Sequence, residues 1–326
     1  MPDNDLNAPV LVTGGAGFVG GVVKRALLDA GRTCVSVDII DDPDTHPSLI
    51  SRTLDIRDDK AMRALFKEFR FTSVFHFATE FMYDTSADRM RLWETNVTAT
   101  QTLRDLCREK GIRHLAFTSS CAVWGQSFTE PVDEMVPTNP IEIYGDSKVA
   151  GEDILLADLE GAGQDLTVVV YRVPVVIDVT RRGSLVLLFD FIREGRKVWT
   201  VGGGKNRFQF LYATDLADAI LKGERSLEGR VVLHLGSDNV PTLADAFEYV
   251  IARSGSGARL ASLPKGLALA GLRFARWLRV SPIGLYQSRM IASDFVYDTT
   301  RAKKTLDWTP TLTNSEMLWL AYEDYI

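Results

Sequence analysis

Short apolar runs rich in Val and Ile alternate with amphipathic helical patterns over the first two thirds of the chain, which is typical of βαβ units around a parallel sheet. Strands are predicted at residues 9–12, 33–38, 52–56, 73–78, 114–119 and 166–173. Helices are predicted at residues 19–30, 58–69, 92–110 and 145–160. The run 166–173 is almost continuously apolar, as in a strand buried on both faces. The expected fold class is therefore α/β, with a doubly wound parallel sheet covered on both sides.

The alternation of strands and helices ends after Pro174. Beyond it the pattern predicts a helix at 185–194, a glycine turn at 202–204, one more sheet strand at 231–235 and mainly helical sequence from about residue 236. A length of 326 residues corresponds to about two domains. We therefore expect two domains: a sheet domain of residues 1–175 plus about 208–235, and a smaller, mainly helical domain of about 176–207 and 236–326.

Composition excludes several classes of protein. The 37 Lys and Arg against 43 Asp and Glu give a formal net charge of −6, so no nucleic-acid partner is expected. Three cysteines without a CxxC pair or His/Cys ligand spacing predict neither a disulfide framework nor a metal site. Asp3 and Asp5 stand where a secretory signal needs a basic start, and no stretch reaches the roughly 18 apolar residues of a membrane span. These features predict a cytoplasmic protein with no integral membrane segment.

Gly14, Gly17 and Gly20 follow the first predicted strand with the spacing GxxGxxG and open the first predicted helix, whose first turn contains Phe18 and Val19. Glycine permits a tight turn and lets the backbone approach a pyrophosphate, while the amides and positive dipole end of the helix face the phosphates. A tight strand-to-helix turn without a ligand would need similar glycines. Their position between strand and helix favours a dinucleotide site in a Rossmann-type domain.

Asp38 agrees with a dinucleotide site. It ends the second predicted strand, where a carboxylate can accept hydrogen bonds from both ribose hydroxyls of NAD. A 2′-phosphate would meet this negative charge at close range, and Ile39 and Ile40 follow rather than an Arg. The predicted cofactor is therefore NAD rather than NADP.

Tyr144 and Lys148 have the spacing YxxxK, which places a phenol and an ammonium on one face if this segment is helical. A tyrosine with an ordinary pKa of about 10 needs roughly 4 kcal/mol of stabilisation of its phenolate to act as a base near neutral pH. A neighbouring ammonium and the positive charge of an oxidised nicotinamide have the right sign. A surface helix with a chance Tyr and Lys would show the same spacing. The cofactor motif upstream favours a catalytic pair in which Lys148 also holds the nicotinamide ribose.

Ser120 lies just past the strand predicted at 114–119, at the strand end where ligands bind in open α/β sheets. Its hydroxyl is a candidate for hydrogen bonding to the reacting oxygen, and Ser119 is the neighbouring candidate. Cys121 and Thr79 also follow predicted strands and are further candidates for contact with the substrate.

Together these motifs resemble the extended short-chain dehydrogenases/reductases of the NAD-dependent epimerase/dehydratase type, a group that also includes the 3β-hydroxysteroid dehydrogenase-like enzymes. The matching residues run through most of the chain: 13–20, Asp38, Asp55, Ile56, 76–78, Asn96, Val97, 118–120, 123–125, 144–148, 208–215 and 297–310. The resemblance implies that Tyr144 is the acid/base, Lys148 the ribose anchor and Ser120 the partner of the substrate hydroxyl.

The resemblance also implies further contacts to the cofactor. Asp55 and Ile56 would border the adenine, Ala78 would line the nicotinamide side, and Asn96 would support the active site. His76 is assigned no chemistry, because a histidine satisfied within the core explains it. Enzymes of this type also suggest a homodimer, formed through a bundle of the helix at 92–110 and the helix after Tyr144.

Two departures from the resemblance concern the substrate. Nucleotide-sugar epimerases usually carry an asparagine after the arginine of the sixth strand, whereas this chain has Val173 and Pro174 after Arg172. The Arg-Pro-Gly-Asp element near the C-terminus is replaced by the segment 292–298. Since both elements help to hold a nucleoside diphosphate, their loss weakens the inference to a UDP-sugar and leaves the substrate class open.

The segment 249–293 contains no acidic residue and seven Lys or Arg, which leaves a formal charge of −13 for the rest of the chain. It fits a domain helix with solvated arginines, a site for a phosphate-bearing substrate, or a peripheral membrane contact. Arg181 and Arg207, in loops outside this segment, are further candidates for binding a phosphate of the substrate.

The predicted function is that of an NAD-dependent oxidoreductase or epimerase, which transfers a hydride at a secondary alcohol or ketone of a sugar or nucleotide sugar. One alternative is a 3β-hydroxysteroid dehydrogenase-like oxidoreductase on a non-nucleotide alcohol. The other is a noncatalytic NAD-binding regulator, against which the intact pair of Tyr144 and Lys148 argues. The expected partners are a small, sugar-like substrate and a second copy of the chain.

Overall fold

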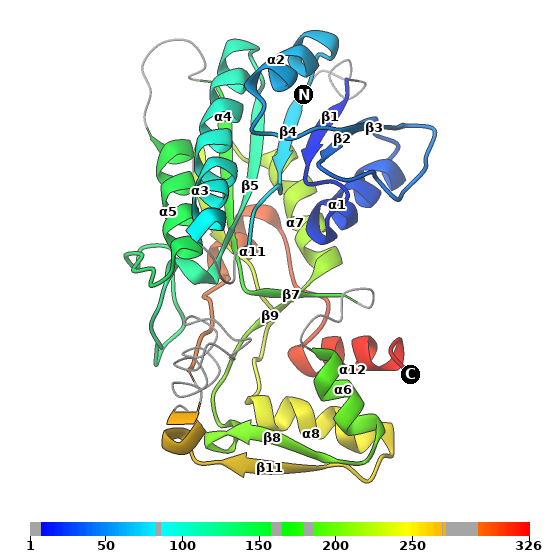
Figure 1. Cartoon of the computed structure of the whole chain (residues 1–326), viewed down its shortest axis with the longest axis vertical. Coiled ribbons are helices and arrows are strands. Elements are labelled where there is room, and N and C mark those ends of the chain that lie inside the picture. Colours follow the sequence, from blue (N-terminus) through cyan, green and yellow to red (C-terminus); the bar gives the residue numbers. More distant parts are fainter. Residues whose placement is uncertain (1–7, 82–85, 158–164, 179–184, 269, 272–292) are drawn as a thin grey trace.

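The computed structural model describes residues 8–81, 86–157, 165–178, 185–268, 270–271 and 293–326 (Figure 1). A seven-stranded sheet of order β10-β6-β5-β4-β1-β2-β3 forms the centre of the first part of the molecule, and every neighbouring pair is parallel. Its strands are β1 Val10–Thr13, β2 Cys34–Asp38, β3 Leu49–Thr53, β4 Ser73–His76, β5 His114–Ser120, β6 Thr167–Val173 and β10 Arg230–His234. The predicted doubly wound parallel sheet is confirmed.

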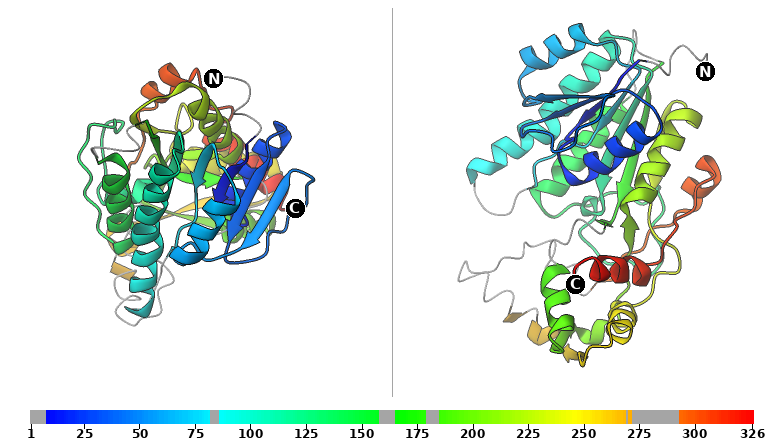
Figure 2. Two further views of the ribbon diagram at one scale, coloured as in Figure 1. Left: turned by 90° about the horizontal axis from the view of Figure 1, so that it is seen from above. Right: turned by 90° about the vertical axis from the view of Figure 1, so that its right-hand side faces the viewer.

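Helices cover both faces of this sheet (Figure 2). They are α1 Phe18–Asp29 and α7 Ala213–Ser226 on one face, and α2 Asp59–Glu68, α4 Ala99–Glu109 and α5 Ile143–Leu156 on the other. Val10 and Val12 of β1 pack into the core that contains α1 and α7, whereas Leu11 packs into the core that contains α2 and α4. Because consecutive side chains enter different cores, the central strands are apolar at consecutive positions rather than at alternate ones.

The edge strand β3 lies at Leu49–Thr53, three residues before the predicted strand at 52–56. Its side chains are partly or fully exposed, so its apolar pattern is weak. The amide of Leu54 donates to the carbonyl of Asp38 at 2.7 Å, and the chain then leaves the sheet. Asp55 and Ile56 consequently lie in the loop beyond the strand.

The helix predicted at 92–110 consists of three consecutive segments, α3 Ser86–Trp93, the π-helical turn η2 Glu94–Thr98 and α4. A π-helical turn adds one residue to the turn of a helix and is frequent at functional sites. α5 begins two residues before the predicted start, at Ile143, and ends at Leu156, while residues 158–164 lie outside the described residues.

The chain after Pro174 forms two small parallel pairs, β7 Val175–Ile177 with β9 Phe210–Tyr212, and β8 Lys197–Val201 with β11 Arg259–Leu263. The sequence did not predict these strands, because each is short and pairs with a segment far along the chain. The helices of this part are α6 Leu185–Arg193, α8 Leu243–Ser254 and α12 Asn314–Glu323. They pack around a third core that includes Phe189, Val250, Phe295 and Leu318.

α11, at Thr300–Leu306, packs on α7 and β10 of the first part. Ala302, Leu306 and Trp308 belong to the same core as α1. The assignment of 236–326 to a single second domain remains a prediction. Within this range, the segment around α11 returns to the sheet and packs against it. The carboxyl ends of the sheet strands point toward the part that contains α8 and β8, and their amino ends lie on the far side (Figures 1 and 2).

Within the described ranges, none of the helices combines the length and the apolar character needed to traverse a bilayer. The same ranges contain no group of three His, Cys, Asp or Glu arranged to hold a metal ion. Cys34, Cys107 and Cys121 are buried, and none of the three is in a disulfide.

Candidate active site

A cavity of about 840 Å³ lies at the carboxyl edge of β1, β2 and β4. Its walls come from the glycine turn, the end of β2, the loop before α2 and the loop after β4. Ten residues of the predicted cofactor and substrate contacts line it: Gly14, Gly17, Phe18, Val19, Gly20, Asp38, Asp55, Ile56, Ala78 and Thr79.

The glycine turn leaves the backbone bare on the cavity side. Gly14 has φ +74°, and a Cβ added to it would lie 2.6 Å from the amide nitrogen of Ala78. A Cβ on Gly20 would lie 2.1 Å from the carbonyl oxygen of Gly14, so the start of α1 packs directly on the turn. Gly17 is the N-cap of α1 and no side chain caps the helix there. Uncapped amides and a positive helix end facing a cavity fit the pyrophosphate of a dinucleotide.

Asp38 is fixed at the end of β2. One carboxylate oxygen accepts from the amide of Ala16 at 3.1 Å and the other from the amide of Ile39 at 2.8 Å. These bonds hold the carboxylate against the glycine turn, and each oxygen keeps a lone pair for a ribose hydroxyl. The position and the charge fit the adenosine ribose of NAD.

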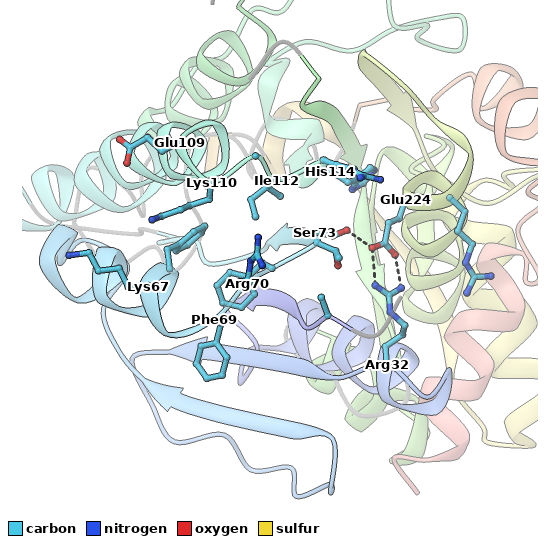
Figure 3. Close-up of a pocket in the computed structure, with 17 residues that line it drawn as sticks. Arg32, Lys67, Phe69, Arg70, Ser73, Glu109, Lys110, Ile112, His114 and Glu224 are labelled. Atoms are coloured by element: carbon cyan, nitrogen blue, oxygen red, sulfur yellow. Dashed lines mark hydrogen bonds and ion pairs between the residues drawn. The ribbon is translucent and has the colours of Figure 1, made fainter. Parts of the chain in front are cut away.

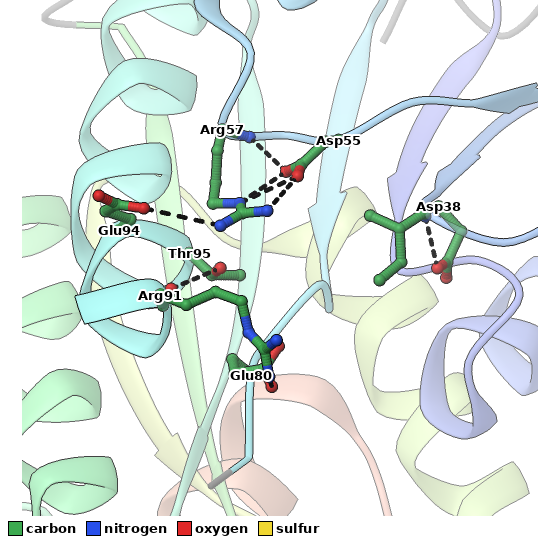
Figure 4. Close-up of polar contacts among 8 residues, drawn as sticks. Asp38, Asp55, Arg57, Glu80, Arg91, Glu94 and Thr95 are labelled. Carbon is green, nitrogen blue, oxygen red and sulfur yellow. Dashed lines mark hydrogen bonds and ion pairs between the residues drawn. The ribbon is translucent and has the colours of Figure 1, made fainter. Parts of the chain in front are cut away.

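The wall beyond Asp38 carries an ion pair (Figure 4). Arg57 Nε lies 3.0 Å from both carboxylate oxygens of Asp55, and Nη2 lies 2.5 Å from Oδ2. The hydrogen bonds from this guanidinium hold the pKa of the Asp55 carboxyl below its ordinary value. Asp55 therefore lines the cavity as an ionised carboxylate that is paired with Arg57.

Sequence reasoning missed the residues of the loop after β4 that follow Thr79. Arg91 Nη2 lies 2.6 Å from Oε1 of Glu80, and both residues line the cavity (Figure 4). The ring of Phe81 lies 4.6 Å from the ring of Tyr144 in an edge-on arrangement. Glu80 and Phe81 directly follow Thr79, so the rule that ligands bind at strand ends would have found both residues. The contact through Phe81 brings Tyr144 to the border of the cavity.

Asn96 ties the loop after β4 to the helix that carries Tyr144. Its Oδ1 accepts from Thr79 Oγ1 at 3.0 Å and from the amide of Glu80 at 2.8 Å. Its Nδ2 donates to the carbonyl of Glu80 and to Ser147 Oγ, both at 3.0 Å. Asn96 is buried in the π-helical turn and does not line the cavity, so its role is to position its neighbours.

His76 is the centre of a buried chain of hydrogen bonds, whose partners the sequence did not predict. Thr100 Oγ1 donates to the carbonyl of Asn96 at 2.8 Å, so it must accept from His76 Nε2, which lies at 2.9 Å. His76 Nδ1 then accepts from Thr13 Oγ1 at 2.7 Å. Burial lowers the pKa of His76 to about 3, which keeps the ring neutral. The histidine links β1 to α4 and, through Thr100, to the carbonyl of Asn96 in η2, so it is a positioning residue.

Tyr144 and Lys148 lie in the first two turns of α5. Lys148 is only 4% exposed, and its Nζ donates to the carbonyl of Thr118 at 3.1 Å. The same Nζ lies 5.8 Å from the ring centroid of Tyr144, so the ammonium and the phenol ring share one face of the helix. Burial lowers the pKa of Lys148 to about 8, with Glu152 opposing the shift.

Ser120 is the last residue of β5, and its Oγ accepts from the amide of Ala122 at 3.1 Å. It is half-buried, whereas Ser119 is buried and its Oγ has no hydrogen-bond partner among the described residues. Cys121 is buried in the short helix η3 Cys121–Val123. Ser120 is thus the more accessible of the two candidate serines.

The described residues provide little evidence on the predicted contacts to a phosphate of the substrate. Arg181 lies outside them, as do residues 272–292 of the basic segment. Arg207 lies three residues before β9 and contacts Asp294. Its amide donates to Asp294 Oδ1 at 2.7 Å, and its Nε lies 3.9 Å from the same oxygen. Thr79 lines the cofactor cavity, whereas Arg207 does not.

Comparison with known proteins agrees with this geometry. The family model described as "NAD dependent epimerase/dehydratase family" matches residues 10–231, more than half of the chain. The chain belongs to this family. It is therefore an NAD-dependent enzyme, and the cavity at the carboxyl edge has the glycine turn and the acidic strand end that NAD requires.

Among individual relatives of this family member, an uncharacterized protein y4nG of Sinorhizobium fredii is 32% identical over 97% of this chain and 78% of its own. A UDP-glucose 4-epimerase of Streptomyces lividans is 32% identical over 75% of this chain and 80% of its own. Solved structures share the fold: a UDP-glucose 4-epimerase of Thermotoga maritima has a TM-score of 0.76 at 22% identity, with 97% of this chain and 98% of that chain covered.

Proposed function

We propose that this enzyme epimerises a secondary alcohol of a sugar or nucleotide sugar. The observation that carries the proposal is the pair of Tyr144 and Lys148 on one face of α5, bordering the cofactor cavity through Phe81. The 32% identity to a UDP-glucose 4-epimerase over 75% of the chain supports a nucleotide sugar as the substrate.

Each residue of the site has a separate task. The glycine turn and the start of α1 would hold the pyrophosphate of NAD, Asp38 the adenosine ribose and Lys148 the nicotinamide ribose. When bound, NAD supplies reversible hydride transfer at the substrate carbon. Tyr144 removes the proton from the substrate hydroxyl at its phenolic oxygen and later returns it. Ser120 donates a hydrogen bond to the oxygen of the substrate hydroxyl.

Lys148 makes this proton transfer possible near neutral pH. Its ammonium is almost completely buried, so water screens its charge only weakly. The charge therefore strongly favours the phenolate form of the neighbouring Tyr144. The cost of burying this charge is visible in its lowered pKa of about 8. The ammonium therefore remains the main form at pH 7 while the site keeps it poorly solvated.

Arg172, near the end of β6, is held by buried contacts to α5 and to Trp124. Arg172 Nη2 lies 2.6 Å from Oε2 of Glu152, and its guanidinium stacks 4.9 Å from the ring of Trp124. These contacts are buried, so the arginine at this strand end holds α5 rather than a substrate. Binding of a nucleoside diphosphate must then rely on residues other than an amide after Arg172.

The test is incubation of the purified enzyme, with NAD added, with UDP-glucose, UDP-galactose and a panel of hydroxysteroids. We expect interconversion of the two nucleotide sugars by product analysis, with no net NADH absorbance. Tyr144→Phe should lower turnover by at least about 100-fold with NAD affinity unchanged, because the general base contributes on that order. Stoichiometric NADH from a hydroxysteroid would instead establish a dehydrogenase, and unchanged cellular activity of Tyr144→Phe would establish a noncatalytic regulator.

The homodimer is also a proposal. α4 and α5 lie side by side on one flank of the sheet (Figures 1 and 2). Exposed side chains on this flank include Gln101, Asp146 and Asp153. Light scattering coupled to size exclusion would show twice the chain mass of 36.2 kDa if the two helices pair with those of a second copy.

A further inference from the structure

A second cavity, of about 740 Å³, lies at the amino edge of the sheet (Figure 3). Its lining comes from the loops that lead into β4 and β5 and from the ends of α2, α4 and α7. It shares no lining residue with the cofactor cavity at the carboxyl edge. A volume of this size accommodates a small metabolite.

The floor of this amino-edge cavity contains buried polar atoms without partners. His114 is 2% exposed, and neither of its ring nitrogens has a hydrogen-bond partner among the described residues. Thr72 Oγ1 and Arg32 Nε, also on the lining, are in the same state within the described part of the chain. Burial lowers the pKa of His114 to about 4, so its ring offers one donor and one acceptor. Buried polar atoms normally find partners, so such a group beside a cavity indicates a bound polar molecule.

Both acidic residues of the lining are already paired. Arg32 donates to the two carboxylate oxygens of Glu224 at 3.1 and 3.2 Å, and Ser73 Oγ donates to the same carboxylate (Figure 3). Glu109 lies 3.0 Å from Arg63. Neither carboxylate therefore neutralises the remaining cations of the cavity.

Four cations of the lining, Lys67, Arg70, Lys110 and Arg225, are exposed and form no ion pair with any described residue. Helix C-termini attract such residues, and α2, α4 and α7 all end here. Three helix ends amount to roughly −1.5 charges. Four unpaired cations exceed this value, so the cavity carries a positive surplus of about 2.5 charges in a protein of net charge −6.

We propose that the amino-edge cavity binds a small phosphate ester that also carries hydroxyl groups. Arg70 and Lys110 meet the phosphate at the rim, where a guanidinium can bind two oxygens at once. Two hydroxyl groups of the ligand hydrogen-bond to the His114 ring, one donating to the unprotonated nitrogen and the other accepting from the protonated nitrogen. Phe69 and Ile112 supply apolar contact for the carbon skeleton.

The test is calorimetric titration of the NAD-saturated enzyme with glycerol 3-phosphate and with inorganic phosphate. Saturating NAD keeps both probes out of the cofactor cavity. We expect one-site binding of glycerol 3-phosphate with a dissociation constant below about 10 mM, and weaker binding of inorganic phosphate. Arg70→Glu should raise the dissociation constant of both probes at least about tenfold, which corresponds to the loss of one charge-assisted bond.

Lys60→Glu is the matched control, because Lys60 is exposed in the first turn of α2, at the other end of this helix from Arg70, and the substitution makes the same change in net charge. Equal weakening by both variants would overturn the proposal, since only general charge would then matter. His114→Phe should bring the affinity for glycerol 3-phosphate down to that for inorganic phosphate and leave the latter unchanged. Absence of saturation, or full affinity in His114→Phe, would also overturn it. NAD affinity is unaffected in all three variants, so failure here leaves the epimerase proposal standing.

Discussion

At the carboxyl edge of the sheet the cofactor cavity presents glycine backbone and the uncapped start of α1, whereas at the amino edge the cavity between α2, α4 and α7 presents charged side chains. The difference follows from topology. In a sheet of parallel strands joined by helices, helix N-termini gather at one edge and helix C-termini at the other. The first edge attracts anions through backbone amides alone. The second edge needs Lys and Arg to offset the helix ends before it can attract an anion.

The largest effect is expected from Glu224→Gln at the amino edge. Arg32 and Glu224 are 6% and 5% exposed, and breaking a buried ion pair costs about 3–5 kcal/mol of unfolding free energy. Chemical denaturation would measure the loss, and NAD affinity of the folded fraction should be unchanged. Glu109→Gln removes an exposed carboxylate of the same cavity and should change stability little. Equal losses in the two variants would contradict the buried character of the pair.

Gly14→Ala breaks the backbone cradle at the carboxyl edge. Its Cβ would meet the amide of Ala78 in a residue with positive φ, so the turn must shift away from its NAD-binding shape. We expect a loss of NAD affinity of at least about 100-fold, close to 3 kcal/mol, by fluorescence titration. Gly31→Ala is the control, because Gly31 has φ +73° with no atom within 4 Å of the added Cβ. It should lower stability without changing NAD affinity.

Lys148→Met sharpens the comparison, since Lys148 is a buried cation at the carboxyl edge, whereas the four unpaired cations of the amino edge are exposed. Its pKa is about 8 in the folded chain and 10.5 ordinarily, so between these pH values the unfolded chain binds more protons. Stability of the natural enzyme should therefore rise by about 3 kcal/mol from pH 8 to pH 10.5 relative to Lys148→Met. Lys60→Met, at an exposed position, should show no such difference. Denaturant titrations across this range would measure it.

Asp38→Asn gives the smallest expected effect. The substitution removes the charge and keeps the shape of the side chain. It should lower the affinity for NAD about tenfold and raise the affinity for NADP, because the 2′-phosphate no longer meets a carboxylate. The ratio of the two affinities is the measurement. An unchanged preference would show that Asp38 does not contact the ribose.

Much of the sheet domain could be predicted, because the apolar runs of β1, β5 and β6 are long and buried on both faces. The strand at 52–56 was misplaced, since β3 is an exposed edge whose ends are decided by pairing with β2. β8 and β11 escaped notice because neither strand has a local partner. In the site, Asp38, Asp55 and Ala78 followed from motifs, whereas Arg91 of α3 belongs to no motif in the sequence and reaches the cavity only through the tertiary fold.

The sequence by itself determined the sheet class, the family and the residues of the cofactor turn, because glycine spacing, strand periodicity and the YxxxK pair are local properties. Only the tertiary structure decided that His76 joins Thr13 to Thr100, that Arg172 is neutralised by Glu152, and that unpaired cations surround a buried His114. Each of these depends on contacts between residues distant along the chain. Burial and charge pairing are properties of such contacts, and no local pattern encodes them.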